Sequence, residues 1–140
     1  MKSLKIAVDF DGTCVEHAYP NVGYEIGAVP VLKRLVEAGH KIILNTMRSG
    51  KELDDAVEWF KKNKIPLYGV YQDPDQYAWT QSPKCYAHIY IDDAALGCPL
   101  TKDYNLPEPR KTFVDWKAVE KLLFDDGLLE EEPEKIVIEE

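Results

Sequence analysis

A short apolar run that ends in two carboxylates decides the fold: Leu4-Lys5-Ile6-Ala7-Val8-Asp9-Phe10-Asp11-Gly12-Thr13. Nearly continuous apolar runs of this length are typical of strands that are covered on both faces, as in a parallel sheet. Three further runs of the same type lie at residues 41–44, 67–71 and 88–91. The sequence therefore predicts four strands of one parallel sheet.

Helical periodicity fills most of the intervals between these runs. Apolar residues recur at helical spacing over residues 31–36 and again over residues 53–60, where Ser49 and Glu52 form a capping-box pattern. A third helix is predicted over residues 115–124. The resulting order of strands and helices is typical of a single-domain, doubly wound, Rossmann-like α/β fold, in which a parallel sheet is flanked by helices.

Length and charge narrow the class of protein. The chain has 140 residues, the size of one domain, and we expect a globular body over residues 1–129 and an acidic tail over residues 130–140. The tail holds six Glu and one Lys, so it carries five of the eight net negative charges. Because no basic patch is present, we expect neither a nucleic-acid nor a membrane partner. Because no apolar stretch could span a bilayer and no signal-peptide pattern begins the chain, we expect a cytoplasmic protein.

Polar and acidic side chains follow three of the four predicted strands. Asp9 and Asp11 follow the first strand, Thr46 follows the second, and Asp92-Asp93 follows the last. The carboxyl ends of parallel strands share one edge of the sheet, which is where ligands bind in such folds. Four carboxylates brought together repel one another unless a cation compensates them, and an all-oxygen ligand set favours Mg²⁺. The sequence therefore predicts a magnesium site at this edge.

The same residues suit the transfer of a phosphoryl group. Asp9 and Asp11 are separated by one residue, so in an extended strand end their side chains project to the same side. One carboxylate can then attack phosphorus while the other handles the proton of the leaving group. The N–H groups of a tight turn at Gly12-Thr13, the Thr46 hydroxyl and the Lys84 ammonium can hold the phosphoryl oxygens.

Asp9-Phe10-Asp11-Gly12-Thr13 resembles the D-x-D-G-T signature of the haloacid dehalogenase superfamily of phosphotransferases. The other motifs of that superfamily follow in its order: a Thr after an apolar strand in Ile42-Ile43-Leu44-Asn45-Thr46, a Lys at Lys84, and an acidic pair in Ile89-Tyr90-Ile91-Asp92-Asp93. Together they span about two thirds of the chain.

The resemblance implies a covalent mechanism. Asp9 would be the nucleophile that forms an aspartyl phosphate, and Asp11 would be the general acid and then the base that activates water. Mg²⁺ would be held by the Asp9 carboxylate, the Asp11 backbone carbonyl and one of the final acidic pair. By alignment with family members, Asp93 is favoured as the direct ligand and Asp92 as its support.

The spacing of the motifs leaves no room for an inserted cap domain, so the chain resembles the capless branch of the superfamily. The function implied is a magnesium-dependent phosphomonoester hydrolase that acts on a small phosphorylated metabolite, of the nucleotide or sugar phosphate class. The alternative is a catalytically weak regulatory module of the same fold that binds phosphate and metal. In capless members a partner chain often covers the active site, so a homo-oligomer is a further possibility.

Several residues keep two interpretations. Arg48 follows Thr46 closely and is either a grip on a substrate anion or a surface arginine near a helix start. Two long connections, residues 14–27 and 72–87, are candidates for a partial lid. In the second, Tyr77 and Trp79 either stack on a substrate or anchor the loop by packing, which we favour. For the three histidines, His17, His40 and His88, we expect structural or surface roles.

Overall fold

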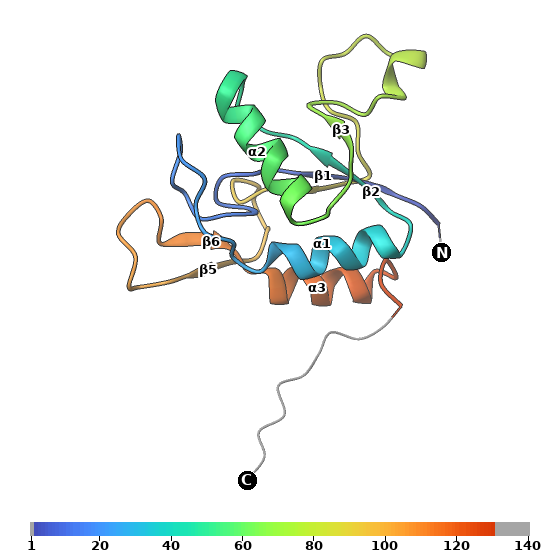
Figure 1. Cartoon of the computed structure of the whole chain (residues 1–140). Helices are drawn as coiled ribbons and strands as arrows, with labels where there is room; N and C mark the ends of the chain where they lie inside the picture. The colour runs from blue at the N-terminus through green and yellow to red at the C-terminus, as the bar shows by residue number, and fades with distance from the viewer. Residues whose placement is uncertain (1, 131–140) are drawn as a thin grey trace.

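A four-stranded parallel sheet forms the centre of the molecule, in a computed structural model that describes residues 2–130 (Figure 1). The strand order is β3-β2-β1-β4, and a separate antiparallel pair joins β5 and β6. In chain order the elements are β1 (Lys5–Val8), α1 (Ala28–Glu37), β2 (Lys41–Leu44), α2 (Gly50–Lys62), β3 (Leu67–Val70), the 3₁₀ helix η1 (Gln76–Ala78), β4 (Ile89–Ile91), β5 (Leu100–Lys102), β6 (Thr112–Val114) and α3 (Trp116–Asp125). The predicted single-domain α/β fold with a parallel sheet and three flanking helices is confirmed.

The register of the sheet places the strand ends side by side. Val8 of β1 lies opposite Leu44 of β2 and Ile91 of β4. The chain runs outward from β1 to β3 and then returns to the other side of β1, so the order of the sheet reverses between β1 and β4. This reversal is the topological switch point at which open α/β sheets bind ligands. The residues that follow β1 and β4 flank this point.

All three helices contribute to one hydrophobic core on one face of the sheet. Ile6, Val8, Ile42 and Leu44 point to this face, where they pack in one cluster with buried side chains of α1, α2 and α3. The helices α1 and α3 lie side by side below the sheet in Figure 1, joined by an ion pair between Arg34 and Glu120 at 2.8 Å. The helices thus brace the sheet from one side.

The opposite face carries no α-helix within residues 2–130. There Ala7 and Ile43 form a small cluster with Cys85, and Tyr68 and Ala87 pack against it, so the connection between β3 and β4 covers this face. The side chain of Gln76, fully buried, organises that connection: its amide donates to the carbonyls of Ser82 and Lys84 and accepts the N–H groups of Asp73 and Tyr86.

The element boundaries agree with the sequence predictions in most places. The four strands and three helices lie where the patterns predict them, to within a few residues at each end. Ser49 is the N-cap of α2, but its side chain makes no capping hydrogen bond. The β5–β6 hairpin was not predicted. Of the predicted tail, residues 131–140 lie outside the described residues, and packing continues through the buried Leu128 and Leu129. No helix within residues 2–130 has the length and apolar character that crossing a membrane requires.

Candidate functional site

Three carboxylates meet at the switch point of the sheet. Asp9 follows β1, and Asp92 and Asp93 follow β4. Each offers an oxygen atom, and these atoms lie within 4.8 Å of one another. The backbone itself sets this spacing, because the Asp9 N–H donates to the carbonyl of Ile91 at 3.0 Å and so ties the two strand ends together. Three of the four predicted carboxylates therefore lie together, and their oxygens could hold one metal ion.

Asp9 lies in an environment that disfavours its charge. Burial, the negative charge of Asp92 and a side-chain hydrogen bond with Asp93 raise the pKa of Asp9 to about 8, against a backbone hydrogen bond at Phe10 that lowers it. A carboxyl with this pKa remains largely protonated at neutral pH unless a cation enters. An all-oxygen set of carboxylates fits a hard divalent cation such as Mg²⁺ or Mn²⁺, so the residues present suit the metal that the sequence predicts.

The turn after β1 holds two of these carboxylates. The Thr13 hydroxyl oxygen lies 3.1 Å from Asp9 Oδ2 and 3.2 Å from Asp93 Oδ1, and it accepts the N–H of Asp93 at 3.1 Å. Gly12 supplies the turn with φ of 77°. The N–H groups of Gly12 and Thr13 donate to the carbonyls of Val15 and Phe10, which are within the turn itself. In this conformation the turn orders the carboxylates, and these two N–H groups are already paired.

The prediction that Asp9 and Asp11 project to the same side is wrong: the chain turns after Asp9, and the Asp11 side chain contacts a buried arginine outside the cluster. The Arg48 guanidinium is almost wholly buried and grips both Asp11 oxygens, each at 2.8 Å. Its remaining three N–H donors reach the carbonyls of Pro20, Asn21 and Glu52. Asp11 accounts for most of the rise in the pKa of Arg48 above its ordinary value. All five donors of Arg48 are thus occupied within the protein, and the residue clamps the loop of residues 14–27 to Asp11 and α2.

Thr46 and Lys84, the two predicted phosphate ligands, are placed differently. Thr46 follows β2, next to β1, and its hydroxyl accepts the N–H of Arg48 at 3.1 Å. Lys84 is exposed, and its ammonium lies 5.9 Å from the centre of the Tyr90 ring, two residues before Asp92. Within residues 2–130 this ammonium makes no hydrogen bond or ion pair. The sheet therefore brings Thr46 to the acidic edge, whereas Lys84 rests on the helix-free face.

His17 is a site residue that the sequence patterns did not indicate. Its ring Nε2 lies 2.8 Å from Asp93 Oδ2. The other two histidines have structural contacts, since ring nitrogens of His40 and His88 accept the backbone N–H groups of Leu4 and Lys5. A lone histidine in a loop belongs to no periodic pattern or motif. The sequence shows only that His17 lies five residues after Gly12.

The two long connections, predicted as candidates for a partial lid, are held by contacts within the protein. Residues 14–27 are pinned by Arg48, by a bridge between Val15 and Glu25, and by an ion pair between Glu16 and Arg110. These contacts hold residues 14–27 in place beside the carboxylate cluster. In the second connection, Trp79 packs edge-on against Tyr86, with ring centres 5.3 Å apart, but Tyr77 and Trp79 are 66% and 64% exposed, so their packing is only partial.

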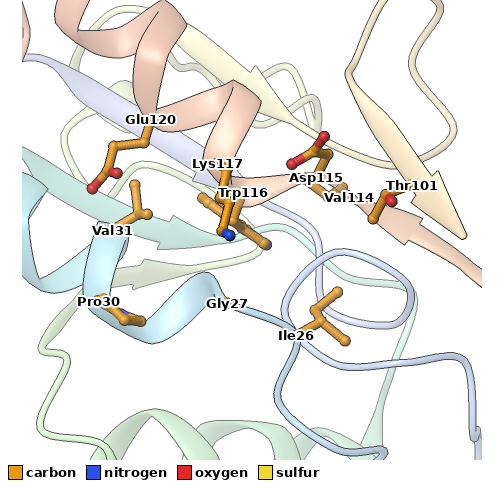
Figure 2. Close-up of a pocket in the computed structure, with 10 residues that line it drawn as sticks. All are labelled: Ile26, Gly27, Pro30, Val31, Thr101, Val114, Asp115, Trp116, Lys117 and Glu120. Carbon is orange, nitrogen blue, oxygen red and sulfur yellow. The ribbon is translucent and has the colours of Figure 1, made fainter. Parts of the chain in front are cut away.

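A cavity of about 530 Å³ lies away from the carboxylates, between α1, α3 and β5 (Figure 2). Val31, Val114 and Trp116 give it an apolar lining, and Asp115, Lys117 and Glu120 add charged side chains. None of the predicted site residues lines it. It is connected to the site through Trp116, whose indole N–H donates to the Thr13 carbonyl at 2.6 Å.

One solved structure resembles this chain along nearly its whole length. It is described as the structure of a conserved protein from Bacteroides thetaiotaomicron, and it is 35% identical, with a TM-score of 0.71. The match covers 89% of this chain and 93% of that one. No protein-family model and no curated protein matches the chain.

Proposed function

This chain belongs to the same family as the conserved Bacteroides thetaiotaomicron protein, and we propose that it is a magnesium-dependent phosphomonoester hydrolase of the capless haloacid dehalogenase type. One observation carries the proposal: three carboxylates converge at the switch point of a parallel sheet, and the carboxylate of the D-x-D-G-T stretch among them has its pKa raised to about 8. A site with uncompensated carboxylates favours a bound divalent cation.

Asp9 is the proposed nucleophile. Its carboxylate oxygen forms a bond to phosphorus while the bond between phosphorus and the leaving-group oxygen breaks, and the leaving oxygen takes a proton from Asp11. Water then attacks the aspartyl phosphate, Asp11 takes the proton of the water, and Asp9 is released with inorganic phosphate. The cation supplies the positive charge that lets a phosphate dianion approach Asp9. Asp9, Asp92 and Asp93 would hold that cation, and the backbone carbonyl of Asp11 would be a further ligand.

The remaining site residues would serve the phosphoryl group. Thr46 follows β2, the strand next to β1, and the exposed Lys84 ammonium has a flexible stem that can turn toward an anion. Gly12 and Thr13 shape the turn that carries both aspartates. Arg48 supports the site by fixing Asp11, a role that replaces the direct grip on substrate considered from the sequence, because its five donors are occupied.

The Asp11–Arg48 pair favours a second candidate function. To protonate a leaving group, the Asp11 side chain must exchange its contacts with Arg48 for contacts with the substrate. A chain in which that exchange is rare would bind metal and phosphate and turn over poorly, as a regulatory module. Retention of a phosphorylated Asp9 after addition of a phosphate donor would support this candidate.

The test is a phosphatase assay on the full chain with Mg²⁺, first with p-nitrophenyl phosphate and then with a panel of nucleotides and sugar phosphates, the proposed substrate class. We expect release of phosphate that disappears on chelation of the cation and in Asp9→Asn. The matched control is Asp54→Asn, which removes an exposed carboxylate from α2 and should retain full activity. Equal rates for wild type and Asp9→Asn, or no release from any member of the panel, would refute the hydrolase proposal.

A further inference from the structure

We propose that His17 is a positioning residue of the acidic cluster: it holds the Asp93 carboxylate in the orientation that binds the cation. The inference rests on the proposed cation site and adds to it a residue outside every motif described above. An ionised carboxylate only accepts hydrogen bonds, so at 2.8 Å the ring Nε2 of His17 carries the hydrogen and donates it to Asp93 Oδ2.

The Gly12 turn creates the space for this contact. A Cβ atom at Gly12 would lie 2.0 Å from His17 Nε2 and 2.6 Å from Asp93 Oδ2, so any other residue would collide with both partners. Glycine is therefore favoured at this position for two reasons: the positive φ of 77° and the space that His17 and Asp93 occupy. The His17 imidazole thus occupies the space that a Cβ at residue 12 would take.

The neighbouring residues hold His17 in place. Glu16 is buried, donates its backbone N–H to the Tyr24 carbonyl at 3.0 Å and pairs with Arg110. Further along the loop, Arg48 binds the carbonyls of Pro20 and Asn21. The His17 ring is thus presented by a loop that is braced on both sides of it, although about a third of its side chain remains exposed.

The cluster has need of such a donor. Thr13 has a single hydroxyl proton and two carboxylate acceptors within reach, Asp9 Oδ2 and Asp93 Oδ1. His17, in contrast, has one carboxylate acceptor, Asp93 Oδ2, so its hydrogen bond is not shared. Without it, repulsion from the Asp92 carboxylate favours rotation of the Asp93 side chain away from the cluster. Loss of a partner that orients a metal ligand typically lowers metal affinity by about 10- to 100-fold.

The experiment measures Mn²⁺ and Mg²⁺ affinity of the full chain at one fixed pH by calorimetry, with variants that separate the hydrogen bond from the packing. His17→Phe keeps a ring and lacks a donor, and His17→Gln keeps an N–H donor near the position of Nε2. We expect about a 10- to 100-fold loss of affinity in His17→Phe and recovery of most of it in His17→Gln. Tyr24→Ala, at an exposed position of the same loop, is the control and should bind as wild type does. At saturating Mg²⁺ we expect turnover of His17→Phe to return toward the wild-type rate, as it would for a residue that acts through the cation.

Three outcomes overturn the proposal. Affinity of His17→Phe within twofold of wild type shows that the contact does not position Asp93, and the hydrolase proposal then stands without it. Equal losses in the Phe and Gln variants, with melting temperatures lowered alike, assign the effect to packing. A wild-type chain that binds neither cation removes both this inference and the proposed function.

Discussion

Asp9 and Asp11 are two residues apart in one turn, yet they meet opposite environments. Asp9 faces two other carboxylates, and its pKa is raised to about 8. Asp11 faces a buried guanidinium that binds both of its oxygens at 2.8 Å. Among the residues that the structure describes, no cationic side chain pairs with the first carboxylate, whereas Arg48 pairs with the second.

This difference gives the two carboxylates of the turn different resting states, one paired within the protein and one available to a cation. A buried charge that is paired and fully hydrogen-bonded is stable as it stands, and breaking such a pair is costly. A group of half-buried carboxylates without a counter-ion is stable only with protons or a cation bound. The Asp11–Arg48 pair is therefore stable without a ligand and must open before Asp11 can transfer a proton, whereas the Asp9 cluster is open to a cation as it stands.

The largest effect is expected at Asp9. Asp9→Asn removes the proposed nucleophile but keeps the shape of the side chain, so we expect phosphatase activity to fall by at least about 10³-fold. The measurement is release of phosphate at saturating Mg²⁺. Activity retained within tenfold would place the nucleophile elsewhere and break the division between the two aspartates.

The next effect concerns the paired side of the turn. Arg48→Met leaves the Asp11 carboxylate and three carbonyl oxygens without their donor, and we expect unfolding free energy to fall by about 3–5 kcal/mol. Chemical denaturation followed by circular dichroism measures the loss. Lys51→Met, which removes an exposed lysine paired with Asp55 on α2, should leave the denaturation midpoint unchanged. Similar midpoints for both variants would show that the Arg48 clamp contributes little to the fold.

The pH dependence should follow Asp9. Its pKa is raised from the ordinary 3.8 to about 8, so the folded chain without cation binds a proton there that the unfolded chain has lost. The stability that this proton provides is full below pH 3.8 and is lost as pH rises through about 8. Mg²⁺ competes with the same proton, so cation affinity should rise by up to about tenfold for each pH unit between 6 and 8.

Two measurements check this sign. Melting temperatures with and without Mg²⁺ should differ more at pH 8 than at pH 6. In Asp9→Asn, without cation, the fall in melting temperature between pH 6 and pH 8 should be smaller than in wild type. A cation effect that is independent of pH would mean that Asp9 is already ionised and that the two aspartates differ less than the geometry indicates.

The smallest expected effect isolates the crowding around Gly12. Gly12→Ala and Gly39→Ala both place a side chain on positive-φ backbone, at 77° and 94°. A Cβ at Gly39 meets no atom within 4 Å, whereas one at Gly12 collides with His17 and Asp93. We expect each to cost about 1 kcal/mol for the backbone, and Gly12→Ala to cost about 1–2 kcal/mol more and to weaken cation binding. Equal costs would show that the turn yields easily to a side chain.

Much of the fold and part of the site could be predicted from the sequence. The apolar runs that form β1 to β4 are short, continuous and separated by helical periodicity, so local pattern and tertiary structure agree. The placement of Asp9, Asp92 and Asp93 at one edge follows from the general geometry of parallel strands. Where local pattern and fold point the same way, one sequence suffices.

The residues that escaped prediction depend on contacts between distant parts of the chain. Arg48 is polar and follows a strand end, which alone is typical of a surface position; its burial requires carbonyls of Pro20, Asn21 and Glu52 to converge on it. His17 contacts Asp93 because Gly12 has no side chain in the space between them, and such a contact leaves no local sequence pattern. Strands β5 and β6 have three residues each, as β4 does, but Leu100-Thr101-Lys102 and Thr112-Phe113-Val114 do not form continuous apolar runs.

The hydrogen bond from Trp116 to the Thr13 carbonyl ties the last helix to the first turn of the site. Thr13 in turn contacts Asp9 and Asp93, so we expect cation binding at the cluster and the docking of α3 to stabilise each other. Opening of α3 removes a support of the turn, and a filled cluster opposes that opening. We therefore expect Mg²⁺ to slow amide hydrogen exchange in α3, which lies more than 100 residues along the chain from Asp9.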